Sequence, residues 1–558
     1  MKKIYLILVV AFSLSLGAFS QSQRFVLFEE FTSASCSYCA SFNPAFNSLL
    51  NANTNKCTSI KYQSNFGYDP MYNDNKADVN VRTAYYSVPG FPDAIMDGNA
   101  YHGSPLYVTQ NMINNQYAVP SPFEITINQQ LSPGNDSIYV TMLGKATAPV
   151  SGVLAAHCVI IEKHIHFTTA PGSNGEKDFY NVMKKMLPSA SGTNLPSSFQ
   201  VGDYFVLQFS WKLANVYNIN ELSVVGFIQD VQTKAVHQAA NTSSTPITGI
   251  YPNDLELSNL GNLLPSYCET TFEPQFKLQN NGSVPLSSAE IKYRVNDGPD
   301  AVYQWAGSLG FLQKTSVSLP IPNYILENNN SLKIYGISTN GVPDDYPKND
   351  SLKYDFQMAS LAGTQVKVLI KTDNNPVETT WDIKDIQGNT LASGGPYTQA
   401  LHTYTTNVDL GFGTCYEFTI YDSGNNGVCC ANGNGFYKLS AGDITIRTGT
   451  SFGSSQTSQF YSQSAVGLGE NPDMASFSVY PNPVSQTAAI SFENAKNEMV
   501  SISVFNMQGV LVLNLPAQEY RSGTHEIFLD FSTLGSGVYT VRLIAGNKVF
   551  AKKITVSR

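Results

Sequence analysis

Two cysteines separated by two residues, Cys36 and Cys39, are the side chains best suited to covalent chemistry. At the start of a helix such a pair can close a small ring, and the unpaired N–H groups and dipole of the helix stabilise a thiolate at the first position. Cys36 would then be the nucleophile and Cys39 the resolving thiol. Three other interpretations remain: a structural disulfide, half of a zinc site, and a fold kept only as a binding scaffold. The zinc interpretation lacks a second C-x-x-C.

The other candidates for metal binding or catalysis carry weaker signals. His164 and His166 are two residues apart, so a strand would place both imidazoles on one face, as metal ligands can be. No carboxylate cluster near them completes a ligand set, and solvent-facing histidines are the simpler interpretation. The sequence has no nucleophile elbow, zinc-protease motif or phosphate-binding loop, so hydrolase and nucleotide chemistry have no support.

Three further cysteines, Cys415, Cys429 and Cys430, lie close together in the sequence. In an oxidising compartment we expect a disulfide that includes Cys415, and Cys429 is the second candidate for it. Spacing alone does not assign the pairing. The other cysteines stand singly, and they are Cys57, Cys158 and Cys268.

The turn that begins at Asp422 is a candidate calcium site. Its oxygen atoms, together with Asp373 and Glu378, are of the kind that Ca²⁺ prefers. Asn425 and Asn426 lower the ligand charge of the turn. A turn stabilised by a disulfide is therefore favoured over a structural calcium ion, and we expect no other cofactor.

The N-terminal residues have the composition of an export signal. Lys2 and Lys3 precede an apolar run at 4–16, and small residues at 18–20 form a cleavage site, so the mature chain should begin near Gln21. No later apolar run approaches the ~18 residues of a membrane helix, so we expect no membrane span in the mature chain. The formal charge of −9 over 558 residues includes no basic stripe, and nucleic acid is therefore not an expected partner.

The elements predicted along the chain are mostly strands. Only residues 24–99 follow a β-α-β order, with a helix over 40–51 directly after the C-x-x-C. From about residue 119 strand follows strand, apart from a short helix expected at 179–186. Charged residues make up only 13% of the chain, as expected for short strands joined by polar turns. The expected fold class is multidomain and mostly β, with one N-terminal α/β domain followed by several β-sandwiches.

The C-terminal block carries four motifs in a fixed order. They are VYPNPV at 479–484, VFNMQG at 504–509, GVYTV at 537–541 and KKITV at 552–556. This set closely resembles the type A sorting domain of the type IX secretion system of Bacteroidetes. The resemblance implies handling by the type IX secretion machinery, proteolytic removal of the domain, and release or attachment to surface polysaccharide.

The N-terminal region resembles thioredoxin-like proteins. The supporting stretches are EEFT at 29–32, CSYC at 36–39 and VPGFP at 88–92. More closely, the region resembles the Bacteroidetes outer-membrane antigen family of about twenty-eight kilodaltons, in which such a domain precedes a β domain. Stretches at 178–188 and 225–230 also fit that family and extend the resemblance over roughly residues 24–240.

The resemblance to thioredoxin-like proteins implies roles for single residues. Glu30 matches their buried acid that relays a proton, and Pro44 matches their helix-kinking proline. Pro92 matches the cis-proline that packs beside the disulfide, so we expect a cis Phe91–Pro92 bond. The motif departs from the family at Ser35, which replaces the usual Trp, and within and after the C-x-x-C, where the rigid Gly-Pro and the following basic residue or proline are replaced.

Two classes of function follow. The first is an extracytoplasmic thiol–disulfide oxidoreductase that acts on protein thiols or disulfides at the cell surface, with Cys36, Cys39, Glu30 and Pro92 as its catalytic residues. The second is a non-enzymatic surface or adhesion protein whose thioredoxin-like fold and β modules serve as a scaffold. The residue set favours the first, and the long β tail favours the second. Either protein is expected to be secreted or held at the outer surface of the outer membrane.

The expected organisation combines these elements in seven parts. They are a signal peptide (1–20), a thioredoxin-like domain (21–118), the β domain of the antigen family (119–246), an immunoglobulin-like β-sandwich (247–360), a β-sandwich accessory module (361–462), a linker (463–476) and the sorting domain (477–558).

Overall fold

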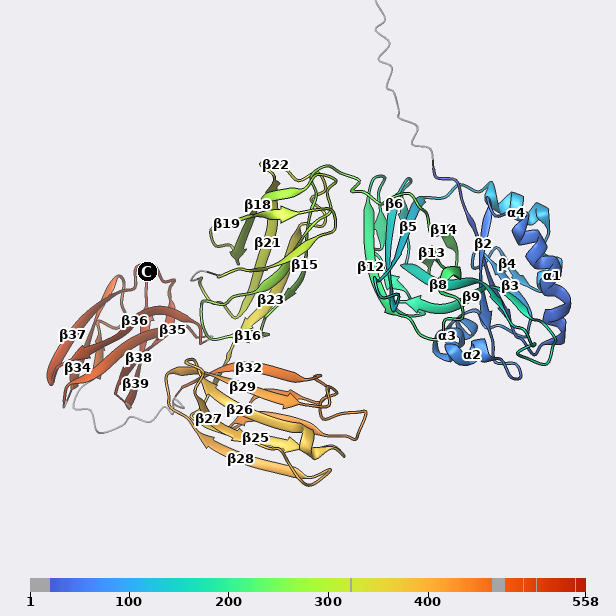
Figure 1. The fold of residues 1–558 in the computed structure, drawn as a ribbon. Helices are drawn as coiled ribbons and strands as arrows, with labels where there is room; N and C mark the ends of the chain where they lie inside the picture. The colour runs from blue at the N-terminus through green and yellow to red at the C-terminus, as the bar shows by residue number, and fades with distance from the viewer. Residues whose placement is uncertain (1–20, 322–323, 464–476, 495, 508, 547) are drawn as a thin grey trace, which may run out of the picture. The chain divides into compact units, whose positions relative to one another are not determined.

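The computed structural model describes residues 21–321, 324–463, 477–494, 496–507, 509–546 and 548–558 (Figure 1). The chain divides into two compact units, residues 1–248 (unit 1) and 249–558 (unit 2). The expected signal peptide lies outside the described residues, as does the expected linker apart from Gln463.

Unit 1 is built on a nine-stranded sheet with the order β14-β13-β8-β9-β2-β1-β3-β4, and β10 lies beside β8. The strands are β1 (Val26–Thr32), β2 (Cys57–Gln63), β3 (Asp93–Met96), β4 (Tyr101–Gly103), β8 (Leu154–His166), β9 (Asp178–Leu187), β10 (Thr193–Asn194), β13 (Leu222–Asp230) and β14 (Val236–Asn241). β1 is parallel to β2 and antiparallel to β3, which pairs with β4. The sheet continues from β2 into β9, so the boundary expected at residue 118 does not separate two sheets (Figure 1).

Helices cover both faces of the sheet beside β1. The helices are α1 (Ser37–Asn51), α2 (Pro70–Asp74), α3 (Lys76–Tyr86) and α4 (Gln110–Tyr117). Phe46 of α1 and Ile113 of α4 share a core with Phe28. Tyr86 of α3 shares the other core with Phe31. Phe28 and Phe31 face opposite sides because side chains alternate along a strand.

A smaller sheet covers the part of the large sheet that holds β8 and β13. It lies on the same face of the large sheet as α1, which covers the part beside β1. Its strands are β5 (Phe123–Leu131), β6 (Ser137–Ala146) and β12 (Tyr204–Lys212), and a two-stranded ribbon joins β7 (Val150–Ser151) to β11 (Ser198–Phe199). Val140 and Met142 of β6 share a core with Cys158 of β8 and Val224 of β13. The two parts expected at 21–118 and 119–246 are therefore packed into one layered unit.

The helix expected at 179–186 is wrong, because these residues belong to strand β9. β9 pairs antiparallel with β8, and a register shift at Ile160/Ile161 leaves Lys184 as an extra residue in the ladder. Such a bulge interrupts the alternation of side chains. Met183 and Met186 consequently enter the same core although they are three residues apart, a spacing that imitates a helix.

A buried polar network joins the parts of unit 1. The Arg82 guanidinium lies 2.7 Å from Glu29 Oε1, and the hydroxyls of Tyr62 and Tyr86 donate to the same carboxylate at 2.8 and 2.5 Å. Arg82 Nη1 also donates to Gln229 Oε1 at 3.2 Å. The network thus links β1, β2 and α3 to β13, which lies beyond residue 118.

The described part of unit 2 holds three modules, each with two sheets around a common core. In the first module, one sheet holds β15 (Leu255–Gly261), β17 (Gln275–Asn280) and β20 (Lys314–Ser318). The other sheet holds β16 (Ser266–Tyr267), β18 (Leu286–Val295), β19 (Ala301–Leu309), β21 (Asn329–Thr339), β22 (Val342–Pro343) and β23 (Ser351–Met358). In the second module, one sheet holds β24 (Ser360–Ala362), β26 (Thr379–Asp385), β27 (Thr390–Gly394), β29 (Thr414–Asp422) and β32 (Ser455–Ser462). The other sheet holds β25 (Gln365–Lys371), β28 (Thr403–Asp409), β30 (Phe436–Ala441) and β31 (Ile444–Gly449). In the third module, one sheet holds β33 (Phe477–Tyr480), β34 (Thr487–Asn494) and β37 (Gly523–Asp530). The other sheet holds β35 (Glu498–Phe505), β36 (Leu511–Tyr520), β38 (Gly537–Ala545) and β39 (Lys548–Val556).

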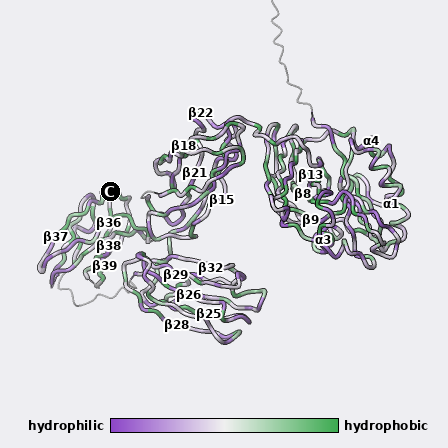
Figure 2. The backbone as a smooth tube through the Cα atoms, viewed as in Figure 1, coloured by the Kyte–Doolittle hydropathy of each residue, from purple (hydrophilic) through white to green (hydrophobic). Residues whose placement is uncertain are grey.

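Hydrophobic and hydrophilic residues are interspersed along the strands of these modules (Figure 2). β18 is an example. After the register shift near its start, every second residue from Ala289 to Val295 is buried. Alternation of this kind places one face of a sheet in the core and the other in solvent. The modules therefore have the mostly β, multidomain character expected from the sequence.

Candidate functional site

The Cys36–Cys39 disulfide lies at the N-terminus of α1. Cys36 is the N-cap residue, with extended backbone angles (φ −92°, ψ 115°), and the helix begins at Ser37. The backbone N–H of Cys39 donates to Cys36 Sγ at 3.1 Å. Cys36 is 2% exposed and Cys39 is fully buried. In the reduced pair, Cys36 occupies the position at which helix amides stabilise a thiolate.

The helix that carries the pair is amphipathic. Its buried residues are Cys39, Asn43, Phe46 and Leu50, which recur every three or four positions. This spacing puts Asn43 one turn after Cys39 on the same face. Pro44 lies inside the helix, at the position expected from the resemblance.

The loop before β3 lies against the sulfur atom of Cys36. The Phe91–Pro92 peptide bond is cis, as expected from the motif. The carbonyl oxygen of Phe91 lies 3.5 Å from Cys36 Sγ. The structure thus brings the Pro92 loop against the Cys36–Cys39 pair, although the loop follows the pair by more than fifty residues in the sequence.

Glu30 lies beneath the helix and is paired. It alternates with Phe28 along β1 and therefore points to the face that α1 covers. The register sets Glu30 beside Lys61 of β2, and the two side chains form an ion pair with exposed fractions of 0% and 3%. Lys61 Nζ also donates to Asn47 Oδ1 of α1 at 2.6 Å. Lys61 is not among the expected site residues, although the parallel β-α-β order could have indicated it.

A loop from the β8–β9 connection also contacts the C-x-x-C segment. Asn174 Nδ2 donates to the carbonyl oxygen of Cys36 at 3.2 Å and to that of Ser33 at 3.1 Å. The Ser173 N–H donates to Ser35 Oγ at 3.2 Å. Sequence motifs do not predict these contacts, because the contacts join residues about 140 positions apart.

Aromatic side chains form an exposed surface beside the disulfide. Tyr38 is 68%, Phe66 50% and Tyr68 67% exposed. Phe66 packs edge to face on Phe91, with ring centroids 6.3 Å apart, and Ser35 Oγ donates to the carbonyl oxygen of Tyr68. Exposed apolar surface of this kind is typical of sites that bind protein segments.

The paired histidines have a carboxylate neighbour that their sequence spacing does not indicate. His164 Nε2 and His166 Nδ1 lie 2.9 and 2.8 Å from Asp178 Oδ1, and these hydrogen bonds lower the pKa of Asp178. The β8–β9 register places His166 opposite Asp178. Within the described residues, no group of three or more His, Cys, Asp or Glu side chains could hold a metal ion.

The candidate calcium ligands are engaged in turns. Asp422 Oδ2 accepts the N–H groups of Asn426 and Gly427, both at 2.8 Å. Asp373 Oδ1 accepts the backbone N–H of Asn375 at 2.8 Å, and Asn375 Nδ2 donates to Glu378 Oε1 at 3.3 Å. These oxygen atoms stabilise the loops at this end of the second module.

The structure gives the cysteine pairing of unit 2, which spacing leaves open. The structure pairs Cys415 with Cys268, and Cys429 with Cys430. Cys415 lies at the start of β29, whereas Cys429 follows the turn at the opposite end of that strand. At ~3.3 Å per residue, the strand separates the two positions by roughly 20 Å, which no disulfide can span.

Peptide mapping without reduction tests this pairing. We expect one peptide that joins Cys268 to Cys415 and a second that contains an internal Cys429–Cys430 bond. Cys415→Ser should release the Cys268 peptide and leave the second unchanged. Recovery of Cys415 linked to Cys429, or as a free thiol, would contradict the pairing.

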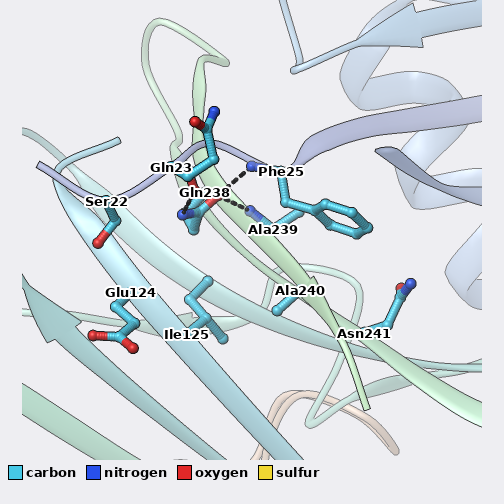
Figure 3. A pocket seen from close by; sticks show the side chains of 9 residues that line it. All are labelled: Ser22, Gln23, Phe25, Glu124, Ile125, Gln238, Ala239, Ala240 and Asn241. Atoms are coloured by element: carbon cyan, nitrogen blue, oxygen red, sulfur yellow. Dashed lines mark hydrogen bonds between the residues drawn. The ribbon is translucent and has the colours of Figure 1, made fainter. Parts of the chain in front are cut away.

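An open cleft of about 530 Å³ lies elsewhere in unit 1, between the N-terminal segment, β5 and β14 (Figure 3). The Gln238 side chain accepts the N–H of Phe25 at 2.8 Å and donates to the carbonyl oxygen of Gln23 at 2.9 Å. Glu124 is its one titratable lining residue. The cleft lining therefore offers no pair of titratable groups for acid–base chemistry.

The motifs at the two ends of the third module lie together. Asn482 Oδ1 accepts the N–H of Thr555 at 2.8 Å, and Asn482 Nδ2 donates to the carbonyl oxygen of Lys553 at 3.0 Å. Val484 exchanges backbone hydrogen bonds with Thr555 and Ser557. The opening motif therefore fastens the last strand, β39.

Comparisons with known proteins identify this module. A family model described as a secretion system C-terminal sorting domain matches residues 478–557. A search of curated proteins found no match. Solved structures similar to the chain include HBP35 of Porphyromonas gingivalis, with 13% identity, 61% of this chain and 99% of that chain covered, and a TM-score of 0.35.

Two other similar structures have lower scores. A structural-genomics protein of Agrobacterium tumefaciens has 10% identity, covers 41% of this chain and 99% of its own, and has a TM-score of 0.28. The FN1–FN3 domains of chicken CNTN1 have 11% identity, cover 55% of this chain and 100% of their own, and have a TM-score of 0.14. None of these likenesses decides the function.

The family match decides the destination of the protein. Within the part of the chain that the structure describes, no helix is long and apolar enough to cross a membrane. The match to the sorting domain is confined to the third module and indicates handling by the type IX secretion machinery. The chain therefore carries a type IX C-terminal sorting domain and is a secreted, cell-surface protein.

Proposed function

We propose that unit 1 carries a thioredoxin-like thiol–disulfide oxidoreductase that acts on protein thiols or disulfides at the cell surface. The observation that carries the proposal is the environment of Cys36 Sγ, which lies 3.1 Å from the N–H of Cys39 and 3.5 Å from the Phe91 carbonyl, beside cis Pro92. The β1-α1-β2 unit, followed by antiparallel β3 and β4 and by α4, supports the thioredoxin-like assignment.

The proposed chemistry is thiol–disulfide exchange. A substrate thiolate attacks Cys36 Sγ, the Cys36–Cys39 bond breaks, and Cys39 leaves as a thiolate that takes up a proton. A second substrate thiolate then attacks the substrate sulfur of the mixed disulfide, and Cys36 leaves. The substrate gains a disulfide and the protein gains a dithiol, and the reverse sequence reduces a substrate disulfide.

The other cysteines of unit 1 do not compete with this pair. Burial, aided by the charge of Asp97, raises the pKa of Cys57 to about 12. Burial also raises the pKa of Cys158 to about 12. At neutral pH both stay as thiols, and a thiol is a far weaker nucleophile than a thiolate.

Substrate trapping on producing cells tests the proposal. Cys39→Ser should accumulate mixed disulfides between Cys36 and surface or secreted proteins, because its Cys36 thiolate attacks a substrate disulfide, a substrate thiolate leaves, and no Cys39 thiol remains to resolve the product. Cys36→Ser should accumulate none, because the attacking thiol is absent. The measurement is the mass shift of the protein on non-reducing gels, with identification of the bound partners.

Cys158→Ala serves as the matched control, since it removes a buried thiol of the same unit and should behave as the unsubstituted protein. If Cys39→Ser traps nothing, and the purified protein neither reduces insulin nor oxidises a reduced peptide, the oxidoreductase proposal fails. The C-x-x-C would then be a structural bridge.

The second candidate is a non-enzymatic surface-binding protein, and two observations favour it. Cys36 is only 2% exposed, and the exposed rings of Tyr38, Phe66 and Tyr68 offer a binding surface that needs no chemistry. On this alternative, we propose that the chain is a member of the outer-membrane antigen family. Its immunoglobulin-like and accessory modules display unit 1, and the mature chain is attached to surface polysaccharide after removal of the sorting domain. Binding that survives Cys36→Ser, together with a lack of trapped partners, would favour it.

A further inference from the structure

Four consecutive backbone carbonyl groups just before α1 accept hydrogen bonds from a single loop. The carbonyls belong to residues 33–36, and the loop is the connection between β8 and β9. The donors and acceptors are Asn174 Nδ2 to Ser33 O (3.1 Å) and to Cys36 O (3.2 Å), the Asn174 N–H to Ala34 O (3.1 Å), and Ser173 Oγ to Ser35 O (3.3 Å). Two residues of the loop thus hold the whole segment that ends at the N-cap cysteine.

The loop lies against this segment at close range. Gly172 allows the approach, because a Cβ atom there would lie 2.2 Å from the carbonyl oxygen of Ala34. Ser33 and Ala34 are fully buried and Cys36 is 2% exposed. Buried backbone carbonyls need hydrogen-bond partners, and little water reaches these. The loop therefore supplies donors that solvent does not replace.

Charged side chains approach the segment from three sides. In the loop, Asn174 Nδ2 also donates to Glu176 Oε2 at 2.6 Å, so its two hydrogens are shared between this carboxylate and the two carbonyls. At the start of α2, Asp69 Oδ2 accepts the backbone N–H of residue 34 at 2.8 Å. Beneath α1, Glu30 is paired with Lys61. The amide group of Asn174 thus separates the segment from the charge of Glu176.

The segment determines where the Cys36 sulfur lies relative to the helix. Cys36 is the N-cap residue, and its Sγ lies 3.1 Å from the backbone nitrogen of Cys39, which donates to it. In the reduced protein, this N–H and the helix dipole stabilise a thiolate at Cys36. The negative ends of nearby carbonyl dipoles oppose a thiolate, and a donor on each carbonyl offsets that effect. The loop therefore both fixes the sulfur and makes its surroundings more favourable to negative charge.

We propose that Ser173 and Asn174 are positioning residues of the redox site, which hold residues 33–36 by their carbonyl groups so that the reduced Cys36 sulfur stays at the first amides of α1 as a thiolate. The inference rests on the proposed function and adds that its site is composite. The nucleophile belongs to the part expected at 21–118, and the loop that supports it belongs to the part expected at 119–246.

The pH profile of Cys36 alkylation tests the proposal. The full chain is reduced with a phosphine and treated briefly with iodoacetamide at a series of pH values, and mass spectrometry measures the rate at Cys36. In the unsubstituted protein the rate should be half-maximal below the pH of ~8.5 expected for a free thiol. Asn174→Ala should raise this midpoint by about half to one pH unit, which slows alkylation about three- to tenfold below the midpoint, and should leave the plateau at high pH unchanged.

Two further variants separate the loop contacts from the charge of Glu176. Asn174→Ala also removes a donor from that carboxylate, and the freed charge would itself oppose a thiolate. Ser173→Ala removes one donor to the segment and leaves the bond between Asn174 and Glu176 intact. Gly172→Ala keeps every donor but forces the loop away from the segment. Both variants should move the midpoint in the same direction as Asn174→Ala.

Asn99→Ala is the matched control, because it removes a side-chain hydrogen bond to a backbone carbonyl, that of Thr233, elsewhere in unit 1. It should leave the profile unchanged. If neither of the two further variants raises the midpoint, the proposal is overturned and a shift in Asn174→Ala belongs to the charge of Glu176. A rate that falls by the same factor at every pH would also overturn it, since such a fall reports access to the sulfur and not its ionisation. Substrate trapping reports on the proposed function and the pH profile reports on the loop, so each can fail without the other.

Discussion

Deletion of residues 477–558 is expected to leave the rest of the chain in the periplasm, with none at the cell surface. The deleted residues form the module matched by the sorting-domain family. It has its own two sheets and core, so its loss removes the address without opening another core. Fractionation and surface proteolysis measure the outcome. Mass spectrometry of the exported wild-type protein should find a chain that begins near Gln21 and lacks the third module.

A shorter deletion, of residues 548–558, should have the same effect. It removes β39, the strand that Asn482 and Val484 hold by hydrogen bonds, and leaves an open sheet edge on β38. Cys36→Ser with an intact third module is the matched control, and it should reach the surface normally. An exported product that retains Val556 would contradict removal of the sorting domain, and surface delivery of either deletion would contradict its role as the address.

Local patterns predict the part of the candidate site that is close in sequence. The helix expected over 40–51 is present, but α1 begins three residues earlier, at Ser37, and includes Cys39. The resemblance of residues 88–92 to thioredoxin-like proteins implies the cis peptide bond that the structure contains. Both features belong to short segments that can be compared with a family motif residue by residue.

The contacts made by distant segments could not be predicted in the same way. Asn174 and Glu176 reach the site from a loop whose sequence has no motif, and their positions follow from the pairing of β8 with β9. Asp178 lies beside His164 for the same reason. The pairing itself was hidden, because the bulge in β9 gives its apolar residues the period of a helix rather than that of a strand.

The same limitation explains the expected boundary at residue 118. The change from a β-α-β pattern to a run of strands is real, but β9 of the second part pairs with β2 of the first. The spacing of apolar residues indicates whether a segment is a helix or a strand, but it does not indicate which other strand pairs with that segment. The network of Glu29, Arg82 and Gln229 crosses the same boundary and links the two parts by buried hydrogen bonds.

Arg82→Met is accordingly expected to destabilise all of unit 1, and not only the segment around α3. The Arg82 side chain is 2% exposed, and its removal leaves the buried Glu29 carboxylate without its cation, which costs ~3–5 kcal/mol. Native-state hydrogen exchange should report this loss equally at amides of β1 and of β13. Glu29→Gln combined with Arg82→Met removes both charges and should recover much of the loss, while Lys163→Gln, at an exposed ion pair, should change stability by less than ~1 kcal/mol. A loss confined to β1, or a double variant no more stable than Arg82→Met, would show that the two parts fold independently and that the ion pair is not what joins them.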